Sequence, residues 1–391
     1  MMGAHVDDVI WAVTPEYEYM VEEFLKNFVI KSIQEGNFRF CGREYSQDNN
    51  YNISVKCKDN TEKILPISYD KGTRSLDAYA TQGEISQMRS VVGSLAWIAR
   101  QVRPKLSYAC SRMQSVVSKA QIKHLEYCNK VLQEAKKDAD VGIYFEANLF
   151  DFHDAILLSI SDASWAGETM VIQDKVFPRR SQYGFFTCLA NPELWTEDQG
   201  NIHVIGWKSA IIKRQCRSTM RAETQAMTYA VDNGTYIRAA IARCRGLYSS
   251  DDWEAKCAKV MKHMWLTDCQ SLHDYVNNPI ASGSEDKRLE IDLEALREAI
   301  WFDSDDNLKD AITSEDNDKI RWIDTSTMIA DPLTKSGNEK FTKPMDATMM
   351  SGRINFIPSD ESVMKKMKSQ KARLAKVMEK NTLCDEGNEE E

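Results

Sequence analysis

The chain has 391 residues, of which 42% are hydrophobic, and a formal net charge of −9 at pH 7. No apolar run approaches the roughly 20 residues of a membrane span and the N-terminus has no signal-peptide pattern, so we expect an intracellular protein, cytoplasmic or nuclear, without membrane contact. Ten Cys occur without a CxxC pair or a Cys/His cluster, which favours free thiols over disulfides or zinc. The length allows two or three domains.

The first residues predict a strand, a tight acidic turn and a second strand over 2–13. The adjacent Asp7 and Asp8 repel each other unless a cation bridges them. They are therefore either the metal ligands of a polymerase palm hairpin or part of a solvent-exposed turn, and on the dipeptide alone the turn is favoured because Asp is common in turns. Residues 14–27 predict a helix with Thr14 as N-cap. Residues 38–45 and 51–56 predict two paired strands.

Three amphipathic segments follow, at 83–99, 104–117 and 119–137, and predict a small helical bundle. A solvated face is the common explanation for basic residues on such a bundle, and a groove for a duplex backbone is the alternative. The basic residues concerned are Arg100, Arg103, Lys105, Arg112, Lys119, Lys123, Lys130, Lys136 and Lys137.

From residue 154 the pattern changes to three strands, a helix, a strand, two helices and a strand, which indicates an α/β layer arrangement. The predicted ranges are 156–160, 183–189, 203–207, 218–243, 263–268, 270–277, 289–301 and 320–324, with a closing helical turn at 330–335.

Four acidic residues are predicted at the ends of these elements: Asp162 after the first strand, Glu223 on the core side of the long helix, Asp268 closing a strand and Asp331 opening the last turn. Each alone would more often be an N-cap or a surface acid. Together they suit Mg²⁺, which prefers carboxylate oxygens, and Mn²⁺ is an alternative. Two such ions about 4 Å apart can hold the attacking and leaving oxygens of a phosphodiester.

The charge distribution permits a nucleic-acid partner although the chain is acidic overall. Acid is concentrated at 303–318 and 389–391, and residues 364–373 form a basic helix candidate to which we assign no chemistry. Basic residues gather instead between Trp207 and Arg245: Lys208, Lys213, Arg214, Arg217, Arg221, Arg238, Arg243 and Arg245.

Short motifs occur in one order along the chain, at 6–8, 90–95, 103–109, 161–167, 207–209, 221–223 and 330–335. This order resembles copia-type retrotransposon Pol polyproteins over roughly residues 1 to 340. The resemblance implies a multidomain α+β and α/β chain. Its expected parts are a partial reverse transcriptase palm (1–70), a helical thumb/connection (71–150), an RNase H-like mixed sheet with flanking helices (151–343) and a charged, flexible C-terminal tail (344–391).

By this resemblance, Asp162, Glu223, Asp268 and Asp331 match the metal-binding acids of an RNase H that hydrolyses the RNA strand of RNA–DNA hybrids. Asp162 and Asp268 would lie nearest two ions. Glu223 would hold one ion and help place the RNA strand, whereas Asp331 would hold the other and position the water.

Asp7 and Asp8 match the paired aspartates of the polymerase palm, as a vestigial metal site. The chain begins almost at that motif, without the palm strand that carries the third aspartate, so we expect no polymerase activity from it alone. Other Pol fragments are candidate partners.

Two departures from the family pattern bear on function. The run 287–291 lacks the family's histidine, which questions histidine-assisted product release, and the acidic insert 303–318 would repel a phosphate backbone. The alternatives to a nuclease are a catalytically inactive nucleic-acid-binding remnant of a retroelement and a reading frame without a functional product.

Overall fold

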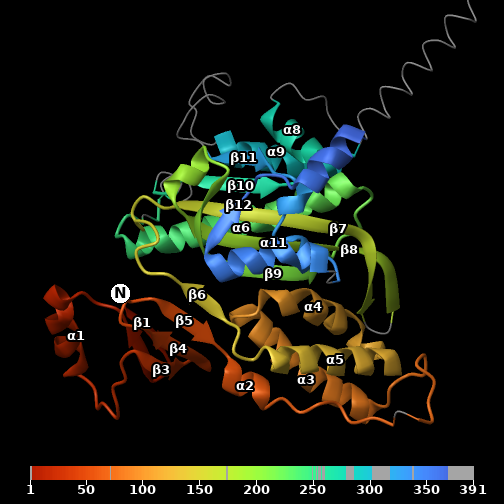
Figure 1. Cartoon of the computed structure of the whole chain (residues 1–391), viewed down its shortest axis with the longest axis horizontal. Helices are drawn as coiled ribbons and strands as arrows, with labels where there is room; N and C mark the ends of the chain where they lie inside the picture. Colours follow the sequence, from red (N-terminus) through yellow and green to blue (C-terminus); the bar gives the residue numbers. More distant parts are fainter. Residues whose placement is uncertain are drawn as a thin grey trace, which may run out of the picture.

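The computed structural model describes residues 2–70, 72–172, 175–248, 250–251, 253, 257, 260–278, 286–301, 318–336 and 339–368. Within these ranges the chain forms two tiers (Figure 1). The lower tier holds the N-terminal strands and the helical bundle, and the upper tier is a six-stranded sheet between helices.

The N-terminal hairpin is formed as predicted. Strands β1 (Met2–His5) and β2 (Asp8–Trp11) pair antiparallel, and the carboxylates of Asp7 and Asp8 are exposed at the turn. The predicted helix at 14–27 is a 3₁₀ turn η1 (Pro15–Tyr17) followed by α1 (Glu18–Leu25). The Thr14 hydroxyl donates to the Glu16 carboxylate (2.5 Å) and does not cap the backbone.

The prediction of one strand over 38–45 is wrong, because the chain reverses within it. Cys41 and Gly42 both have positive φ, which breaks the strand and makes a tight turn. The result is an antiparallel four-stranded sheet of β3 (Asn37–Phe40), β4 (Arg43–Gln47), β5 (Ile53–Lys56) and β6 (Ile143–Phe145).

The predicted bundle is present. Its elements are α2 (Lys58–Glu62), α3 (Gln82–Gln101), η2 (Pro104–Leu106), α4 (Ser107–Val116), η3 (Val117–Lys119) and α5 (Ile122–Lys137). A capping box between Thr81 and Glu84 starts α3. The bundle core around Met88 and Leu125 continues onto β5 and β6, so described residues on both sides of the boundary predicted at 70/71 share one core. Their assignment as palm and thumb stays a prediction.

The upper sheet has the strand order β11-β10-β7-β8-β9-β12. Strands β7, β8, β9 and β12 pair antiparallel, whereas β10 is parallel to both β7 and β11. The bounds are β7 (Ile156–Ile172), β8 (Lys175–Ala190), β9 (Gln199–Ile211), β10 (His263–Thr267), β11 (Lys319–Trp322) and β12 (Arg353–Asn355).

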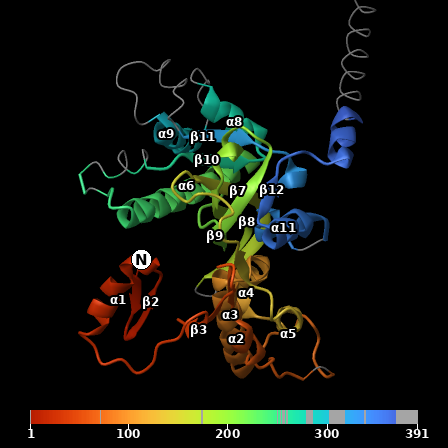
Figure 2. The same cartoon turned by 60° about the vertical axis from the view of Figure 1, so that its left-hand side comes forward.

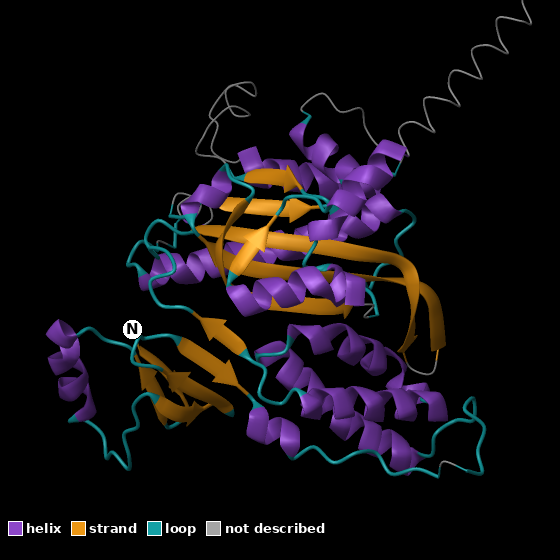
Figure 3. Ribbon diagram, in the orientation of Figure 1, coloured by secondary structure: helices purple, strands orange, loops and turns teal. Residues whose placement is uncertain are grey.

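The prediction that the first strand of this sheet ends at Asp162 is wrong. Strand β7 continues for ten further residues and, with β8, forms a curved arm that reaches over the bundle (Figure 3). The small residues at 163–167 form an irregularity in the ladder, with Ala166 at a φ of 57°, where a turn was expected. A bulge of this kind bends a strand without ending it.

Helices cover both faces of the sheet (Figure 2). On one face lie α6 (Thr219–Cys244), α8 (Gln270–Asn277) and α9 (Lys287–Trp301), and the Ser159 hydroxyl of β7 donates to the Ala230 carbonyl of α6 (3.1 Å). On the other face, η5 (Thr325–Thr327), η6 (Asp331–Leu333) and α11 (Glu339–Ser351) cover Leu158 and Ile160. A short 3₁₀ turn, η4 (Pro192–Trp195), joins β8 to β9.

The prediction of a flexible tail from residue 344 is wrong for its first part. Met345 of α11 is buried in the sheet core, β12 pairs with β9, and a helix follows at 360–368. The apolar side chains of Met345, Ile354 and Phe356 hold this segment, although charged residues dominate the composition around it. Residues 369–391 and most of the acidic insert, 302–317, lie outside the described residues. None of the described helices is long and apolar enough to cross a lipid bilayer.

Candidate metal centre

The candidate centre lies where β10 and β11 end, at the edge of the sheet where α/β proteins commonly bind ligands. Its first two carboxylates follow from strand register. Leu266 of β10 pairs with Ile160 of β7 in parallel, so Asp268 and Asp162, each two residues further on, come side by side. Carboxylate oxygens of Asp162, Glu223 and Asp268 all lie within 4.8 Å of one another. Three of the four predicted acids therefore meet in one group.

Glu223 reaches this group from the first turns of α6. The Ser218 hydroxyl accepts the Arg221 backbone N–H (3.2 Å) and fixes where the helix starts. The Glu223 side chain is buried, and its Oε2 has no hydrogen-bond partner. Burial, followed by the charges of Asp162 and Asp268, raises the pKa of Glu223 well above its usual value.

Burial and the charge of Asp331 likewise raise the pKa of Asp162 to about 6. Burial raises the pKa of Asp268, and the charge of Asp162 adds to that shift. Raised pKa values of neighbouring buried acids are a feature that clusters at functional sites.

Asp331 lies beside the group and is paired with a lysine. Its Oδ1 is 2.6 Å from Lys335 Nζ, which is also 3.9 Å from Asp162 Oδ2. Burial alone would lower the pKa of Lys335, but the charges of Asp162 and Asp331 outweigh it and raise this pKa. The Thr334 hydroxyl also donates to Asp162. Sequence reasoning missed both residues, although the i, i+4 spacing of Asp331 and Lys335 is that of a helical ion pair.

Gly184 explains how η6 comes so close to Asp162. This glycine of β8 pairs with Asp162 across the ladder. A Cβ at position 184 would lie 2.4 Å from the Leu333 Cβ of η6, which real atoms do not tolerate. The bare backbone at Gly184 therefore lets Asp331 and Thr334 approach β7.

Asp268 is held by the chain that follows β11. Thr325 Oγ1 donates to Asp268 Oδ2 (2.8 Å), and the Trp322 indole N–H donates to the Asp268 carbonyl (3.0 Å). These two contacts fix the side chain and the backbone of the only member of the carboxylate group that is partly exposed.

The helix at 360–368 anchors this segment through Asp324. The buried Asp324 carboxylate accepts hydrogen bonds from the Ser326 backbone N–H (2.9 Å) and the Ser362 hydroxyl (2.8 Å), and it forms an ion pair with Lys366 (2.5 Å). The Lys366 ammonium also lies 4.3 Å from the centre of the Trp322 ring. Residues 360–368 thus brace the loop that carries Thr325.

We expect Lys366→Met to destabilise the protein in a pH-dependent way. Burial opposes ionisation of Asp324, but the hydrogen bonds from Lys366, Ser326 and Ser362 outweigh it and lower the pKa of Asp324. The stabilisation is therefore complete above the ordinary Asp pKa of about 4 and declines as the pH falls below it. Because half of the Lys366 side chain is exposed, the loss at pH 7 should be about 1 kcal/mol or less.

Urea unfolding at pH 7 and pH 3 measures this loss, with Lys365→Met as the matched control. Lys365 is an exposed neighbour on the same helix. Equal losses for the two variants, or a Lys366→Met loss that is the same at both pH values, would rule out the brace.

A basic cavity of about 570 Å³ lies beside the start of α6. The buried Arg221 guanidinium donates to the Asp286 carboxylate within it. The remaining charged lining residues are basic: Arg214, Arg217, Lys287 and Arg288. Lys287 and Arg288 belong to the run 287–291, in which the histidine expected from the retrotransposon resemblance is missing. In the structure they add positive charge beside Arg221.

Two arginines of the predicted basic stretch from Lys208 to Arg245 have partners within the fold. Arg238 is buried and its guanidinium bonds both carboxylate oxygens of Asp318 (2.7 Å each). Arg245 donates to the carbonyls of Val260 and Phe152. Both arginines therefore stabilise the fold through contacts between segments that are distant in the sequence. Asp7 and Asp8 are also separate from the centre, since among the described residues they belong to no group of three metal-ligating side chains.

Comparison with known proteins gives one sequence relative of note, and no family model matches the chain. Over 240 residues the chain is 24% identical to a retrovirus-related Pol polyprotein from transposon RE2 of Arabidopsis thaliana. The match covers 58% of this chain and 15% of the relative, so the chain spans a small part of that polyprotein. The predicted resemblance to a retrotransposon Pol polyprotein is thereby confirmed, whereas the copia type stays a prediction.

Two solved structures are also similar to parts of the chain. They are the N-terminal RNase H domain of a Mycobacterium tuberculosis protein fused to maltose binding protein (13% identity, 50% of this chain, 99% of that one) and RNase H1 from Halobacterium salinarum (14%, 49% and 98%). The TM-score is 0.26 for each.

Proposed function

We propose that the upper tier is an RNase H-like unit that hydrolyses the RNA strand of RNA–DNA hybrids with the help of a divalent metal ion. The single observation that carries the proposal is the buried Glu223 carboxylate, which has an unpartnered Oε2 and lies within 4.8 Å of the carboxylate oxygens of Asp162 and Asp268. An unpaired buried charge is costly, and a cation would remove that cost.

The donor set fits a hard divalent cation. All three side chains of the group offer carboxylate oxygens, the ligands that Mg²⁺ and Mn²⁺ accept. The charge of Lys335 acts on Glu223 and Asp268, but burial and the neighbouring carboxylates outweigh it and keep the pKa of both acids raised. Asp162, Glu223 and Asp268 would hold one ion. Asp331 would share a second with Asp162, in place of its present pair with Lys335.

Bound there, divalent ions would make a water molecule more acidic and would stabilise negative charge on a phosphodiester. The chain's own residues prepare the centre for that chemistry. Thr334 and Thr325 orient the carboxylates of Asp162 and Asp268, and Gly184 admits η6. Lys335, half-buried beside Asp331, adds a positive charge at the edge of the carboxylate group.

The sheet supports the same proposal. Four antiparallel strands continued by two parallel ones, with helices on both faces, agree with the RNase H-like mixed sheet that the family resemblance implies. The similarity to a Pol polyprotein makes a nucleic-acid substrate reasonable. The cavity lined by Arg214, Arg217, Lys287 and Arg288 lies at the start of the helix that carries Glu223 and offers positive charge to a phosphate backbone. Contacts to 2′-hydroxyls would distinguish RNA from DNA.

The direct test is hybrid cleavage by the purified chain. A hybrid labelled separately on its RNA and DNA strands is incubated with Mg²⁺ over a range of concentrations, then with Mn²⁺, and then with EDTA. We expect the RNA strand alone to be cut, in either metal and not in EDTA. Cutting of both strands, or cutting that persists in EDTA, would contradict the proposal.

Binding without cleavage is the second candidate function. The Lys335 ammonium, which already pairs with Asp331 and lies near Asp162, favours it, because a lysine at that position competes with a second ion. Salt-dependent hybrid binding with no turnover at any metal concentration would select this alternative.

A further inference from the structure

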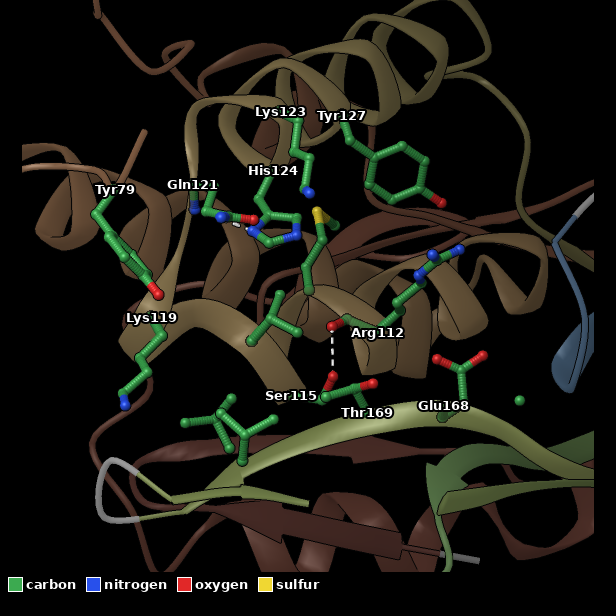
Figure 4. A pocket seen from close by; sticks show the side chains of 15 residues that line it. Tyr79, Arg112, Ser115, Lys119, Gln121, Lys123, His124, Tyr127, Glu168 and Thr169 are labelled. Carbon is green, nitrogen blue, oxygen red and sulfur yellow. Dashed lines mark hydrogen bonds between the residues drawn. The ribbon is translucent and has the colours of Figure 1, made fainter. Parts of the chain in front are cut away.

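A second cavity of about 390 Å³ lies in the lower tier, between the bundle and the β7–β8 arm (Figure 4). Helix α4, the turn η3 and the start of α5 form one wall, and the arm forms the other. Met113, Val116 and Val171 give it an apolar surface. Its volume suits one nucleotide-sized group and is too small for a duplex.

The lining carries more positive than negative charge. Arg112, Lys119 and Lys123 are basic, and Glu168 is the one acidic residue that lines the cavity among those described. Glu168 is buried and accepts a hydrogen bond from the Tyr108 hydroxyl (2.5 Å), and Lys123 pairs with Asp77 (2.8 Å). The Arg112 guanidinium pairs with no carboxylate of the described chain, which leaves its five N–H groups for a ligand.

His124 adds a neutral donor to these cations. Its Nδ1 accepts the Gln121 backbone N–H (3.0 Å), so the proton lies on Nε2. Burial and the charges of Lys123 and Arg112 lower the pKa of His124 and keep the ring neutral at physiological pH.

Aromatic rings flank the cationic lining. Figure 4 shows Tyr79 and Tyr127 at opposite sides of the cavity, with His124 between them. Tyr79 is 67% exposed, a large fraction for an aromatic side chain, and its ring is accessible from solvent. Rings beside a cationic site are the arrangement by which proteins stack unpaired bases while they hold the phosphates.

We propose that this cavity binds one nucleotide of a single-stranded nucleic acid, with its phosphate on Arg112 and its base against Tyr79. This inference takes one premise from the proposed function, namely that the chain binds nucleic acid. Glu168 follows Asp162 by six residues on β7, so this lining residue of the cavity lies within about 20 Å of Asp162, the span of six extended residues. A single strand that leaves a hybrid at the metal centre would therefore have a second point of attachment within a few nucleotides.

The test measures binding of a fluorescent ten-nucleotide single strand by anisotropy, with the full chain in EDTA over a series of salt concentrations. We expect Arg112→Gln to weaken binding about tenfold and to reduce the slope of log K against log salt by about 0.7, the value for one phosphate contact on a single strand. Arg112→Lys should keep the slope. Tyr79→Leu should weaken binding at least fivefold, whereas Tyr79→Phe, which keeps the ring, should not.

Arg100→Gln is the matched control, because Arg100 is exposed on the same bundle and does not line the cavity. Both substituted positions of the cavity are largely exposed, and thermal unfolding confirms that each variant is folded. Unchanged binding by Arg112→Gln and Tyr79→Leu, or equal losses in Arg100→Gln, would overturn the proposal.

Competition with a mononucleotide and with a blunt hybrid distinguishes a single strand from the two other nucleic-acid ligands. A mononucleotide that displaces the strand at equal concentration would show a pocket for free nucleotides and overturn the strand assignment. A blunt hybrid bound as tightly as the single strand, and equally weakened by Arg112→Gln, would overturn it as well. Because binding is measured in EDTA, its outcome does not depend on whether the chain cleaves hybrids.

Discussion

Asp162→Asn is expected to abolish RNA cleavage, with a loss on the order of 10³-fold or more. The substitution keeps the volume of the side chain and leaves an oxygen that can still accept from Thr334. Among the neighbouring carboxylates Asp162 has the largest charge effect on Glu223, and its own pKa responds to the charge of Asp331, so the substitution removes the central negative charge of the group. The measurement is the initial rate of RNA cleavage at saturating Mg²⁺.

Asp154→Asn serves as the control for this prediction, because Asp154 is an exposed acid just before β7. It should retain the full rate. Cleavage that survives Asp162→Asn within tenfold of the wild-type rate would show that the group of Asp162, Glu223 and Asp268 is not the catalytic centre.

Without metal, the same carboxylates are expected to destabilise the fold as the pH rises. A carboxyl group whose pKa is higher in the folded protein than in the unfolded chain stabilises the protein below its unfolded pKa, and that contribution is lost as the pH rises through the folded pKa. For Asp162 the window runs from about pH 4 to about 6, and for Glu223 it extends further because its pKa lies well above the usual value. Wild type in EDTA should therefore lose stability relative to Asp162→Asn between pH 5 and pH 8.

Divalent metal should reverse this loss. At a Mg²⁺ concentration a hundred times the dissociation constant, binding to the folded state adds about 2.7 kcal/mol. For a unit of this size that corresponds to a rise in Tm of roughly 5 to 10 °C at pH 8. The rise should be absent in Asp162→Asn and smaller at pH 5, where protons compete with the ion. A wild-type Tm that does not respond to Mg²⁺ or Mn²⁺ would contradict the metal assignment.

The convergence of Asp162, Glu223 and Asp268 could be predicted from the sequence, because the pattern of apolar residues around each of them is local. The apolar run before Asp162 and the one before Asp268 each predict a buried strand that leads into an acid. Two such strands become neighbours whenever they pair in parallel. Glu223 followed from helical periodicity, since its neighbours on α6 are apolar. To predict that these three residues converge, it was therefore enough to predict the two strands and the helix and to place them in one sheet layer.

The rest depended on contacts between segments that carry no local signal. Nothing at Asp331 shows that Lys335 will compete for its carboxylate, and the role of Gly184 is visible only when η6 lies on the sheet. The β7–β8 arm was missed because small residues that usually make a turn instead make a bulge. The charged composition after residue 344 concealed the apolar side chains of Met345 and Ile354 that belong to the core.

Strand β12 and the helix at 360–368 have a practical consequence for anyone who expresses the upper tier alone. A fragment cut at residue 343, where composition suggests a boundary, would expose the edge of β9 to pairing with other chains and would remove the helix that braces Asp324. Such a fragment should aggregate, and its failure would say nothing about the chemistry of the centre. Truncation after Lys368 keeps both closing elements.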